Sequence, residues 1–283
     1  MSMVASRGRV RAVVRNVLLT LFAIPWVVVP VWLVLVNSAK STPEAGELGL
    51  GLPKEWHLLD NYMTVIVEGD YPTALRNSLV VVLPAIALTL LLGSVAAWAY
   101  ARSSSMGMRV AYNVTVLTIL LPPALLPTIF ILQQTGLQGS TLGYVLVTIG
   151  VRLGLVVFLM VGFIRQLPPS LEEAAQVDGA SRLSVYWHII LPLTRPVFFV
   201  AGVLLTISVW NEFFFASFLL AAQDQATLPL ALFQFSSQGG AQVLRVWNLI
   251  FAHVVLTSLP LVVVYIFAQK RVISGLTDGG VQG

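Results

Sequence analysis

The chain has 283 residues, of which 57% are hydrophobic and 10% are charged, and its formal net charge is +4 at pH 7. Soluble domains carry about 25% charged residues, so this composition excludes an ordinary soluble globular protein. The chain contains no cysteine, which excludes disulfides and metal sites or clusters that depend on cysteine ligands.

Apolar residues gather in six blocks, each close to the length of about 20 residues that crosses a bilayer. The blocks lie near residues 17–36, 77–101, 110–133, 142–164, 197–221 and 247–268. They lack the alternating pattern of membrane β-barrel strands, and backbone groups in lipid need partners within their own segment. The sequence therefore predicts an all-α membrane protein, a bundle of six transmembrane helices over 17–268 with short segments 1–16 and 269–283 at its ends.

The distribution of basic residues predicts the orientation of this bundle. Eleven of the sixteen Lys and Arg residues fall on one side of the six-span arrangement. They are Arg7, Arg9, Arg11, Arg15, Arg102, Arg109, Arg165, Arg182, Arg195, Lys270 and Arg271. The positive-inside rule places both termini in the cytoplasm. The first block exceeds the apolar run of a signal peptide, about 7–15 residues, so we interpret it as an uncleaved span.

The first half of the chain contains a long polar segment and a block interrupted by prolines. Segment 37–73 is the longest polar stretch and contains six acidic residues, which suits either an external partner or a solvated connector. In the third block, Pro122, Pro123 and Pro127 each remove a backbone donor, so we expect this helix to kink or break. Such a break makes Pro123 a candidate for the transport pathway, although proline is also common in ordinary membrane helices.

The stretch "LPPSLEEAAQVDGASRLSVYWHIILPLTRP", residues 167–196, separates the fourth and fifth blocks. Ser170 followed by Glu173 matches a capping box at the start of a helix, and Gly179 is suited to end that helix in the left-handed conformation. A second amphipathic helix then places Leu183, Tyr186, Trp187 and Ile190 on one face. Two short helices around a hinge, too short to span the membrane, predict a docking element for a cytoplasmic partner.

The same stretch carries a family resemblance. Glu173-Ala174-Ala175, three residues, Gly179, nine residues and then Ile189-x-Leu191-Pro192 resembles the EAA loop of importer-type ABC transporter permeases. The tail "GLTDGGVQG" and "WNEF" at 210–213 are similar to the maltose-type permease subfamily, and "LDNYMTVI" at 59–66 and "RNSL" at 76–79 match more weakly. Asp278 departs from the small residue usual in that tail.

The resemblance implies a permease subunit of a binding-protein-dependent importer for a carbohydrate, an oligosaccharide or related polyol, in the prokaryotic plasma membrane. In such families the EAA loop, here about 166–196, contacts a cytoplasmic ATPase that drives alternating access. The implied coupling residues are Glu172, Glu173, Ala174, Ala175, Asp178, Gly179, Ala180, Leu191 and Pro192. The implied ATPase contacts of the tail, for which a frayed terminus is the alternative, are Gly275, Leu276, Gly279 and Gly283.

The implied partners are a second homologous permease, two ABC ATPase subunits, an extracellular solute-binding protein, the carbohydrate and membrane lipid, with no nucleic acid. If ATP drives the transport, the sequence itself requires a separate ATPase, because none of its three lysines follows a glycine as in the P-loop pattern. We therefore expect no cofactor on this chain, with ATP and Mg²⁺ on the ATPase. We find no catalytic motif or metal constellation, and so expect a transport subunit and not an enzyme.

Polar residues inside the blocks are candidates for the transport pathway. Glu212 is costly in a membrane unless it faces a cavity or a partner, so we assign the pathway to "WNEF" as well as Pro123. These residues are Trp210, Asn211, Glu212 and Phe213. Packing remains an equal alternative for Trp210. For Glu212 the alternatives are a polar contact to the companion permease and hydration near the outer end of a helix break. Arg152 fits either snorkelling or pairing with a carboxylate, and His253 favours a hydrogen bond between helices over a ligand role.

Two other classes of function compete with the importer. An ion-gradient-driven secondary carrier would need acidic residues at several depths and internal repeats, and Glu212 alone offers support. A scaffold subunit of a membrane complex fits the composition, although the complete EAA spacing argues against it. A membrane-embedded enzyme would need convergent His, Asp or Glu side chains in the spans, and the sequence lacks them.

Overall fold

The computed structural model describes residues 2–121, 124–220, 222–238 and 246–278. Over these residues, the regular elements are helices. Four of them are long and apolar enough to cross a membrane, and two bent helix pairs bring the number to six if each pair forms one span. The predicted all-α membrane architecture is confirmed.

The chain forms two compact units, which are described separately. The first contains residues 1–71 and 232–259, and the second contains 72–231 and 260–283. The helices of the first unit are α1 (Ser2–Asn37), α2 (Thr42–Ala45) and α3 (Leu58–Glu68). The last two helices of the chain, α13 (Leu228–Gln238) and α14 (Trp247–Asp278), contribute residues to both units.

In the first unit, the polar segment 37–73 is folded and not a slack connector. The side-chain amide of Asn61 donates to the carbonyl oxygens of Ser38 and Lys40, both at 2.9 Å. The amide of Asn248 in α14 donates to Oδ1 of Asn61 at 2.8 Å. Buried amides with satisfied donors of this kind fix a segment in place, so α3 and the start of α14 are joined by polar as well as apolar contacts.

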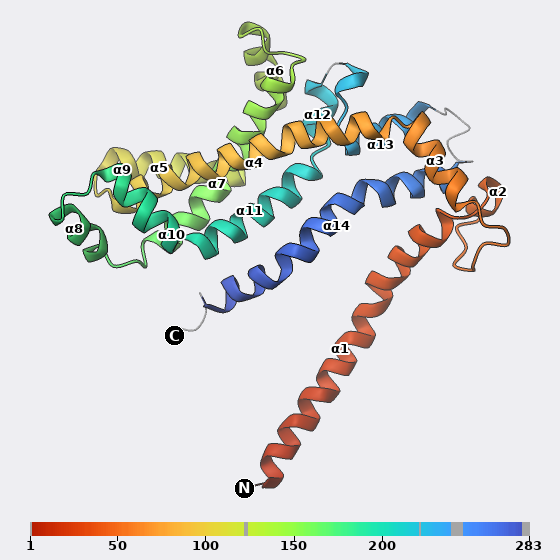
Figure 1. The fold of residues 1–283 in the computed structure, drawn as a ribbon, viewed down its shortest axis with the longest axis horizontal. Helices are drawn as coiled ribbons and strands as arrows, with labels where there is room; N and C mark the ends of the chain where they lie inside the picture. The colour runs from red at the N-terminus through yellow and green to blue at the C-terminus, as the bar shows by residue number, and fades with distance from the viewer. Residues whose placement is uncertain (1, 122–123, 221, 239–245, 279–283) are drawn as a thin grey trace. The chain divides into compact units, whose positions relative to one another are not determined.

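The second unit holds most of the spans. Its helices are α4 (Tyr71–Arg102), α5 (Met106–Leu120), α6 (Leu125–Gln134), α7 (Thr141–Ile164), α8 (Ser170–Val177), α9 (Arg182–Val185), the π-helix η1 (Tyr186–Ile190), α10 (Leu191–Leu193), α11 (Arg195–Trp210), α12 (Phe214–Leu219) and the 3₁₀ turn η2 (Gln223–Gln225). Helix α7 packs against α5 and α11, and buried residues of α4, α7, η1 and α11 form one apolar core. Figure 1 shows α8, α9 and α10 gathered at one end of these helices.

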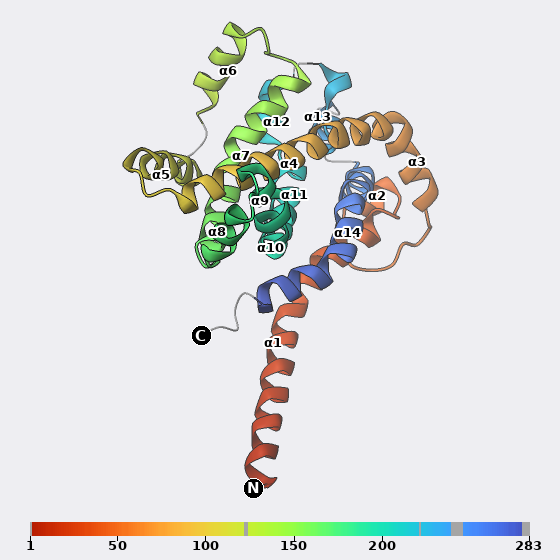
Figure 2. The ribbon, with the colours of Figure 1, turned by 60° about the vertical axis from the view of Figure 1, so that its left-hand side comes forward.

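Two of the predicted spans are interrupted. Helix α5 ends at Leu120 and α6 begins at Leu125, with 116° between them, which confirms the predicted break in the third span. Figure 2 shows α6 directed away from α5. Pro123 lies outside the described residues, so its pathway role stays a prediction. The second interruption lies beside Glu212, where α11 ends at Trp210 and α12 begins at Phe214.

Two boundaries near the C-terminus differ from the prediction. Residues 222–246 lie between the fifth and sixth predicted blocks, but α13 occupies 228–238. Pro229 falls in the first turn of α13, where proline costs no backbone hydrogen bond, and an apolar run follows it. Helix α14 continues to Asp278, ten residues past the expected end near 268, so Gly275 and Leu276 lie on a helix. Gly279 and Gly283 lie outside the described residues.

Candidate functional site

The residues 166–196, here called the coupling segment, begin with α8. The predicted capping box is wrong, because the N-cap position belongs to Pro169, which makes no side-chain cap bond. Pro169 already has helical φ and ψ of −59° and −27°, so Ser170 falls inside the first turn. A capping side chain needs extended backbone at its own residue. The helix starts one residue earlier than the capping box requires.

The end of α8 confirms the role predicted for Gly179 in the backbone. Gly179 has φ of +84°, in the left-handed region. Its N–H donates to the carbonyl of Gln176 at 3.0 Å, and the N–H of Ala180 donates to the carbonyl of Ala175 at 2.9 Å. This pair of bonds is the Schellman motif, in which glycine avoids the Cβ clash of other residues. A sharp, exposed turn therefore separates α8 from α9.

The second half of the coupling segment differs from the prediction in its register. Its N-cap is Ser181, whose Oγ accepts from the N–H of Ser184 at 3.2 Å. Residues 186–190 then form a π-helix, whose i→i+5 bonds change the angle between successive residues. Tyr186 and Ile190 are buried, but Leu183 and Trp187 are exposed. The single apolar face predicted for these four residues is therefore wrong.

Glu172 is directed into the protein. Its side chain is 9% exposed, and Oε1 lies 2.6 Å from Nε of Arg102, the last residue of α4. Oε2 accepts a hydrogen bond from the indole N–H of Trp98 at 2.9 Å. A second guanidinium nitrogen of Arg102 donates to the carbonyl of Leu167 at 3.0 Å. These bonds fasten the start of α8 to the end of α4.

The structure divides the predicted coupling residues into two groups. One group faces the chain's own core: Glu172, Ala175, Ala180, Leu191 and, partly, Pro192. The other group is exposed: Glu173, Ala174, Asp178 and Gly179. Val177, beside the turn, is 87% exposed. The second group and its apolar neighbour make a surface that an external partner can reach, and their contact with an ATPase stays a prediction.

The break in the fifth predicted span is built around Glu212. Helix α11 ends at Trp210, and Oε1 of Glu212 accepts the backbone N–H of Phe215 at 2.9 Å, which satisfies one free donor at the start of α12. Oε2 of Glu212 lies 2.6 Å from the guanidinium of Arg152 on α7. The two side chains are 11% and 16% exposed. Of the two roles open for Arg152, the structure selects pairing with a carboxylate.

The four "WNEF" residues have different surroundings. Trp210 is 6% exposed, so its ring packs within this chain. Asn211 is exposed, and its amide donates to the carbonyl of Ile207 at 2.8 Å. Phe213 is half-buried. Asn211 therefore has an accessible polar side chain beside the helix break, whereas Glu212 is occupied by contacts within the chain.

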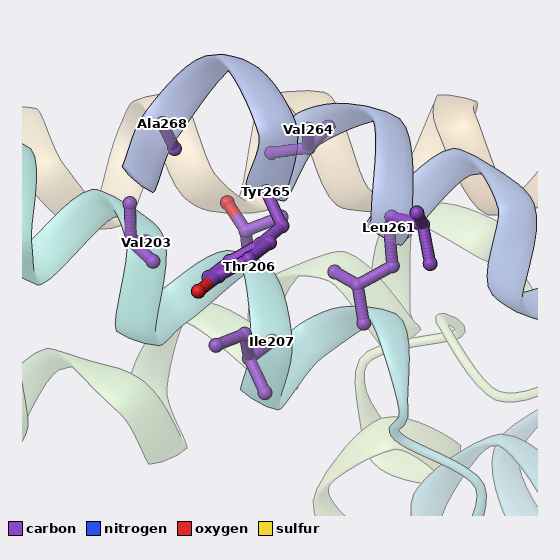
Figure 3. Close-up of a pocket in the computed structure, with 8 residues that line it drawn as sticks. Val203, Thr206, Ile207, Leu261, Val264, Tyr265 and Ala268 are labelled. Atoms are coloured by element: carbon purple, nitrogen blue, oxygen red, sulfur yellow. The ribbon is translucent and has the colours of Figure 1, made fainter. Parts of the chain in front are cut away.

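A groove of about 270 Å³ lies between α11 and the part of α14 that follows Pro260. Figure 3 shows side chains of both helices meeting around it. Its lining residues are Val203, Thr206, Ile207, Leu261, Val262, Val264, Tyr265 and Ala268. The Thr206 hydroxyl donates to the carbonyl of Gly202 at 2.8 Å. Carbon atoms line the groove, so it does not suit a polyhydroxyl ligand, which needs fixed polar groups.

The structure differs from the role expected for His253. His253 is fully buried, and its Nδ1 lies 3.1 Å from the hydroxyl of Thr257, one turn further along the same helix. The expected bond between helices is made instead by Asn248, to Asn61. Among the described residues, no three His, Asp or Glu side chains are grouped so that they could hold a metal ion.

Sequence reasoning missed the partners of Glu172 and Tyr186. The hydroxyls of Ser94 and Tyr186 lie 2.6 Å apart, and Trp98 packs against Tyr186 with 5.8 Å between ring centroids. Ser94, Trp98 and Arg102 are spaced by four residues, which places them on one face of α4. That spacing was a usable signal, because it combines a hydroxyl, an indole and a guanidinium at the end of an otherwise apolar helix.

Comparisons with known proteins identify the family of this chain. Residues 89–277 match the family described as "Binding-protein-dependent transport system inner membrane component". The chain is 32% identical, over 89% of its length and 91% of the relative, to the "Probable starch degradation products transport system permease protein AmyC" of Thermoanaerobacterium thermosulfurigenes. It is 30% identical, over 97% and 90%, to the "Diacetylchitobiose uptake system permease protein NgcG" of Streptomyces coelicolor.

A solved structure has the same fold. It is a chain of a bacterial ABC transporter involved in the import of the acidic polysaccharide alginate. The TM-score is 0.78, with 24% sequence identity, 93% of this chain and 97% of that chain covered. At this identity the likeness concerns the fold.

Proposed function

The chain belongs to the family of binding-protein-dependent transport system inner membrane components, and from this membership we propose that it carries a carbohydrate across the membrane in an ATP-driven importer. The curated relatives named for starch degradation products and diacetylchitobiose support the carbohydrate class. The observation that carries the proposal is the exposed turn at Gly179, which lies in the complete EAA spacing and presents α8 to a partner.

The exposed half of the coupling segment is the ATPase contact in this proposal. Glu173, Ala174, Asp178 and Gly179 are exposed on or beside α8, with Val177 as an apolar contact. A helix seated in a groove commonly buries such an apolar side chain within a polar rim. The absence of a side chain at Gly179 lets the partner approach the turn closely. ATP and Mg²⁺ belong to the ATPase, and this chain converts its motion into a change of access.

In the membrane, the proposed pathway runs beside the break between α11 and α12. Asn211 supports this placement, because its exposed amide can exchange hydrogen bonds with sugar hydroxyls. Phe213, half-buried next to it, offers an aromatic edge. Trp210 and Glu212 act as structural supports in this proposal, since one is packed and the other is paired with Arg152. The apolar groove of α11 and α14 is left to lipid or protein side chains.

The proposal includes the partners and the orientation. A companion permease, two ATPases and an external binding protein complete the importer, and both termini and the coupling segment lie in the cytoplasm. The distribution of Lys and Arg supports this orientation. Gly275 and Leu276 lie near the end of α14, and the proposal brings this end, with the following residues Gly279 and Gly283, to the ATPase.

The competing functions have less support. A secondary carrier needs acidic groups in its spans that are free to bind the driving ion, but the Glu212 carboxylate is engaged by Arg152 at 2.6 Å and by the backbone N–H of Phe215 at 2.9 Å. A scaffold subunit does not need an exposed turn with glycine at positive φ in the EAA spacing. An importer is consistent with both the paired Glu212 in the span and the exposed turn at Gly179.

The experiment measures ATP hydrolysis by the whole complex in lipid nanodiscs, with its companion permease, ATPases and binding protein. Maltotriose, trehalose and diacetylchitobiose are the solutes, and Gly179→Asp is the variant. Asp accepts the left-handed conformation better than most residues, so the substitution keeps the turn and adds a charged side chain at the contact. We expect one of these solutes to stimulate hydrolysis in the wild type and the variant to lose the stimulation.

The matched control is Gly136→Asp. Gly136 is also exposed, has φ of +72°, and has open space around its missing Cβ, but it lies outside the coupling segment. The control should keep stimulated hydrolysis. Equal loss in both variants, or none in either, contradicts the coupling role of the turn. A wild-type complex that ignores every carbohydrate contradicts the proposed solute class.

A further inference from the structure

The coupling segment is fastened to one helix on both sides of its hinge. Glu172 lies before Gly179 and Tyr186 lies after it, and both are hydrogen-bonded to α4. Their partners Ser94, Trp98 and Arg102 share one face of α4 at four-residue spacing. We call these five side chains the α4 strap.

The bonds of the α4 strap are partly or wholly shielded from water. The Arg102–Glu172 pair combines opposite charges with a hydrogen bond at 2.6 Å, and such charge-assisted bonds are about twice as strong as neutral ones. Ser94 and Tyr186 are 1% and 2% exposed, so water does not compete for their bond. The indole of Trp98 contacts both ends, because it donates to Glu172 and packs on the Tyr186 ring.

A hinge with one free side allows its two helices to move separately. Here, the segments before and after Gly179 are both bonded to the same nine-residue stretch of α4, residues 94–102. Arg102 also holds the carbonyl of Leu167, just before α8. A displacement of α8 therefore cannot be absorbed by bending at Gly179 without breaking polar bonds in a shielded place.

Helix α4 also has a point of close contact next to the strap. A Cβ added to Gly93 would lie 2.7 Å from Cγ1 of Val156 on α7. The missing side chain lets the two helices approach, and packed interiors transmit displacement because they hold few voids. The strap and this contact occupy adjacent residues, Gly93 and Ser94.

From these observations we infer that Ser94, Trp98, Arg102, Glu172 and Tyr186 are positioning residues that make α4 and the coupling segment one moving body. Motion imposed on α8 then passes to the second span at Arg102, Trp98 and Ser94. This inference rests on the proposed function, because it assumes that a partner displaces α8. It assigns Glu172 to transmission inside the chain, and leaves Glu173 to the contact with the partner.

The first test measures whether the body is rigid. The chain has no cysteine, so spin labels at Ser104→Cys and Ser170→Cys report the separation between the end of α4 and the start of α8. Both sites are exposed and outside the strap. We expect the same distance distribution in the full complex without nucleotide and after ATP hydrolysis in the presence of vanadate, which traps ADP. A distribution that shifts between these states in the wild type overturns the inference.

The second test separates transmission from assembly. Glu172→Gln combined with Tyr186→Phe removes the charge and the hydroxyl while keeping the side-chain shapes. Tyr186→Phe alone serves if the double variant does not assemble. We expect ATP hydrolysis to continue while solute transported per ATP falls at least about fivefold, at the low end of ordinary coupling between sites. The Ser104–Ser170 distance should broaden in the same variant.

The matched control is Tyr100→Phe. The Tyr100 hydroxyl also belongs to α4, but its partner is the hydroxyl of Thr115 on α5, at 3.3 Å, and not a residue of the coupling segment. It should keep the wild-type ratio of transport to hydrolysis. A strap variant with the wild-type ratio, or a Tyr100→Phe variant with the same loss, overturns the inference. A wild-type complex that transports no carbohydrate contradicts the proposed function instead, and the distance measurement still decides the rigidity of the body.

Discussion

Two short helices of this chain, α8 and α12, begin beside a glutamate that is held by an arginine from a long neighbouring helix. Glu172 pairs with Arg102 of α4 at the start of α8, and Glu212 pairs with Arg152 of α7 before α12, both at 2.6 Å. A carboxylate near a helix N-terminus is favourable in both places, because free N–H groups and the helix dipole face it. An arginine–glutamate pair therefore stands at the start of both helices.

The two places differ in what surrounds the arginine. Arg102 is the last residue of α4, where the helix dipole favours a positive charge, and it also reaches the carbonyl of Leu167. Arg152 lies within a 24-residue apolar helix, and its Nε is buried without a hydrogen-bond partner in the described structure. The first pair orients α8, an exposed helix, at the end of α4. The second makes a helix break tolerable inside an apolar span.

The largest expected effect follows from removing the charge of Glu212. Glu212→Gln leaves the Arg152 guanidinium without its counter-charge in an apolar span, and loss of one partner of a buried pair costs about 3–5 kcal/mol. Glu172→Gln should cost less, because Arg102 lies at the end of its helix and keeps the Leu167 carbonyl at 3.0 Å, whereas Arg152 lies within an apolar helix and its bond to the Ser208 carbonyl is longer, 3.4 Å. The thermal unfolding midpoint of the assembled complex in nanodiscs, followed by tryptophan fluorescence, should fall clearly further for Glu212→Gln.

The control for this comparison neutralises both partners. Arg152→Met combined with Glu212→Gln removes the isolated charge, so most of the lost midpoint should return. An equal fall of the midpoint for Glu172→Gln and Glu212→Gln would mean that the two arginine–glutamate pairs contribute equally to stability. A double variant less stable than Glu212→Gln would show that Arg152 does more than balance this carboxylate.

A smaller effect sharpens the contrast from the side of helix packing. Gly154, two residues after Arg152, faces α5 closely: an added Cβ would lie 2.5 Å from the carbonyl oxygen of Thr115. Gly154→Ala must push α5 and α7 apart, which typically costs about 1–3 kcal/mol. The unfolding midpoint of the complex should fall.

Helix α7 supplies its own control. Gly150 and Gly162 have nothing within 4 Å of an added Cβ, so alanine there should be neutral, or stabilising by up to about 1 kcal/mol through its higher helix propensity. If Gly150→Ala and Gly154→Ala lower the midpoint equally, the effect belongs to the helix as a whole and close packing beside Arg152 is not its cause.

Local signals explain what the sequence predicted correctly. The apolar blocks predict the spans, the prolines predict the break between α5 and α6, and Gly179 predicts the turn after α8, because each signal acts on its own backbone. The EAA spacing is also local, so the coupling segment was recognisable from residues 167–196 alone. The exposed Glu173 and Gly179 belong to this predictable part.

Long-range pairing explains what the sequence missed. Arg152 and Glu212 are 60 residues apart, and in helices that are apolar on all sides the periodicity gives no face to align. The contacts that Glu212 makes at the break, to Arg152 and to the N–H of Phe215, were therefore hidden. The π-helix at 186–190 altered the register that placed Tyr186 with Leu183, and so concealed the bond to Ser94. These features depend on how the helices pack, which composition and spacing do not determine.

The smallest effect separates the capping of α8 from that of α9. Ser181 caps α9 by accepting from the N–H of Ser184 at 3.2 Å, and replacing a serine N-cap by alanine costs about 1 kcal/mol. Ser170 is the matched control, since it lies inside the first turn of α8 and the N-cap there is Pro169. Hydrogen exchange of the backbone amides of residues 182–185 should speed up about fivefold in Ser181→Ala. Ser170→Ala should leave the amides of α8 unchanged. Faster exchange in α8 would restore the capping box that the sequence suggested, and it would mean that α8 depends on its own cap as well as on Arg102.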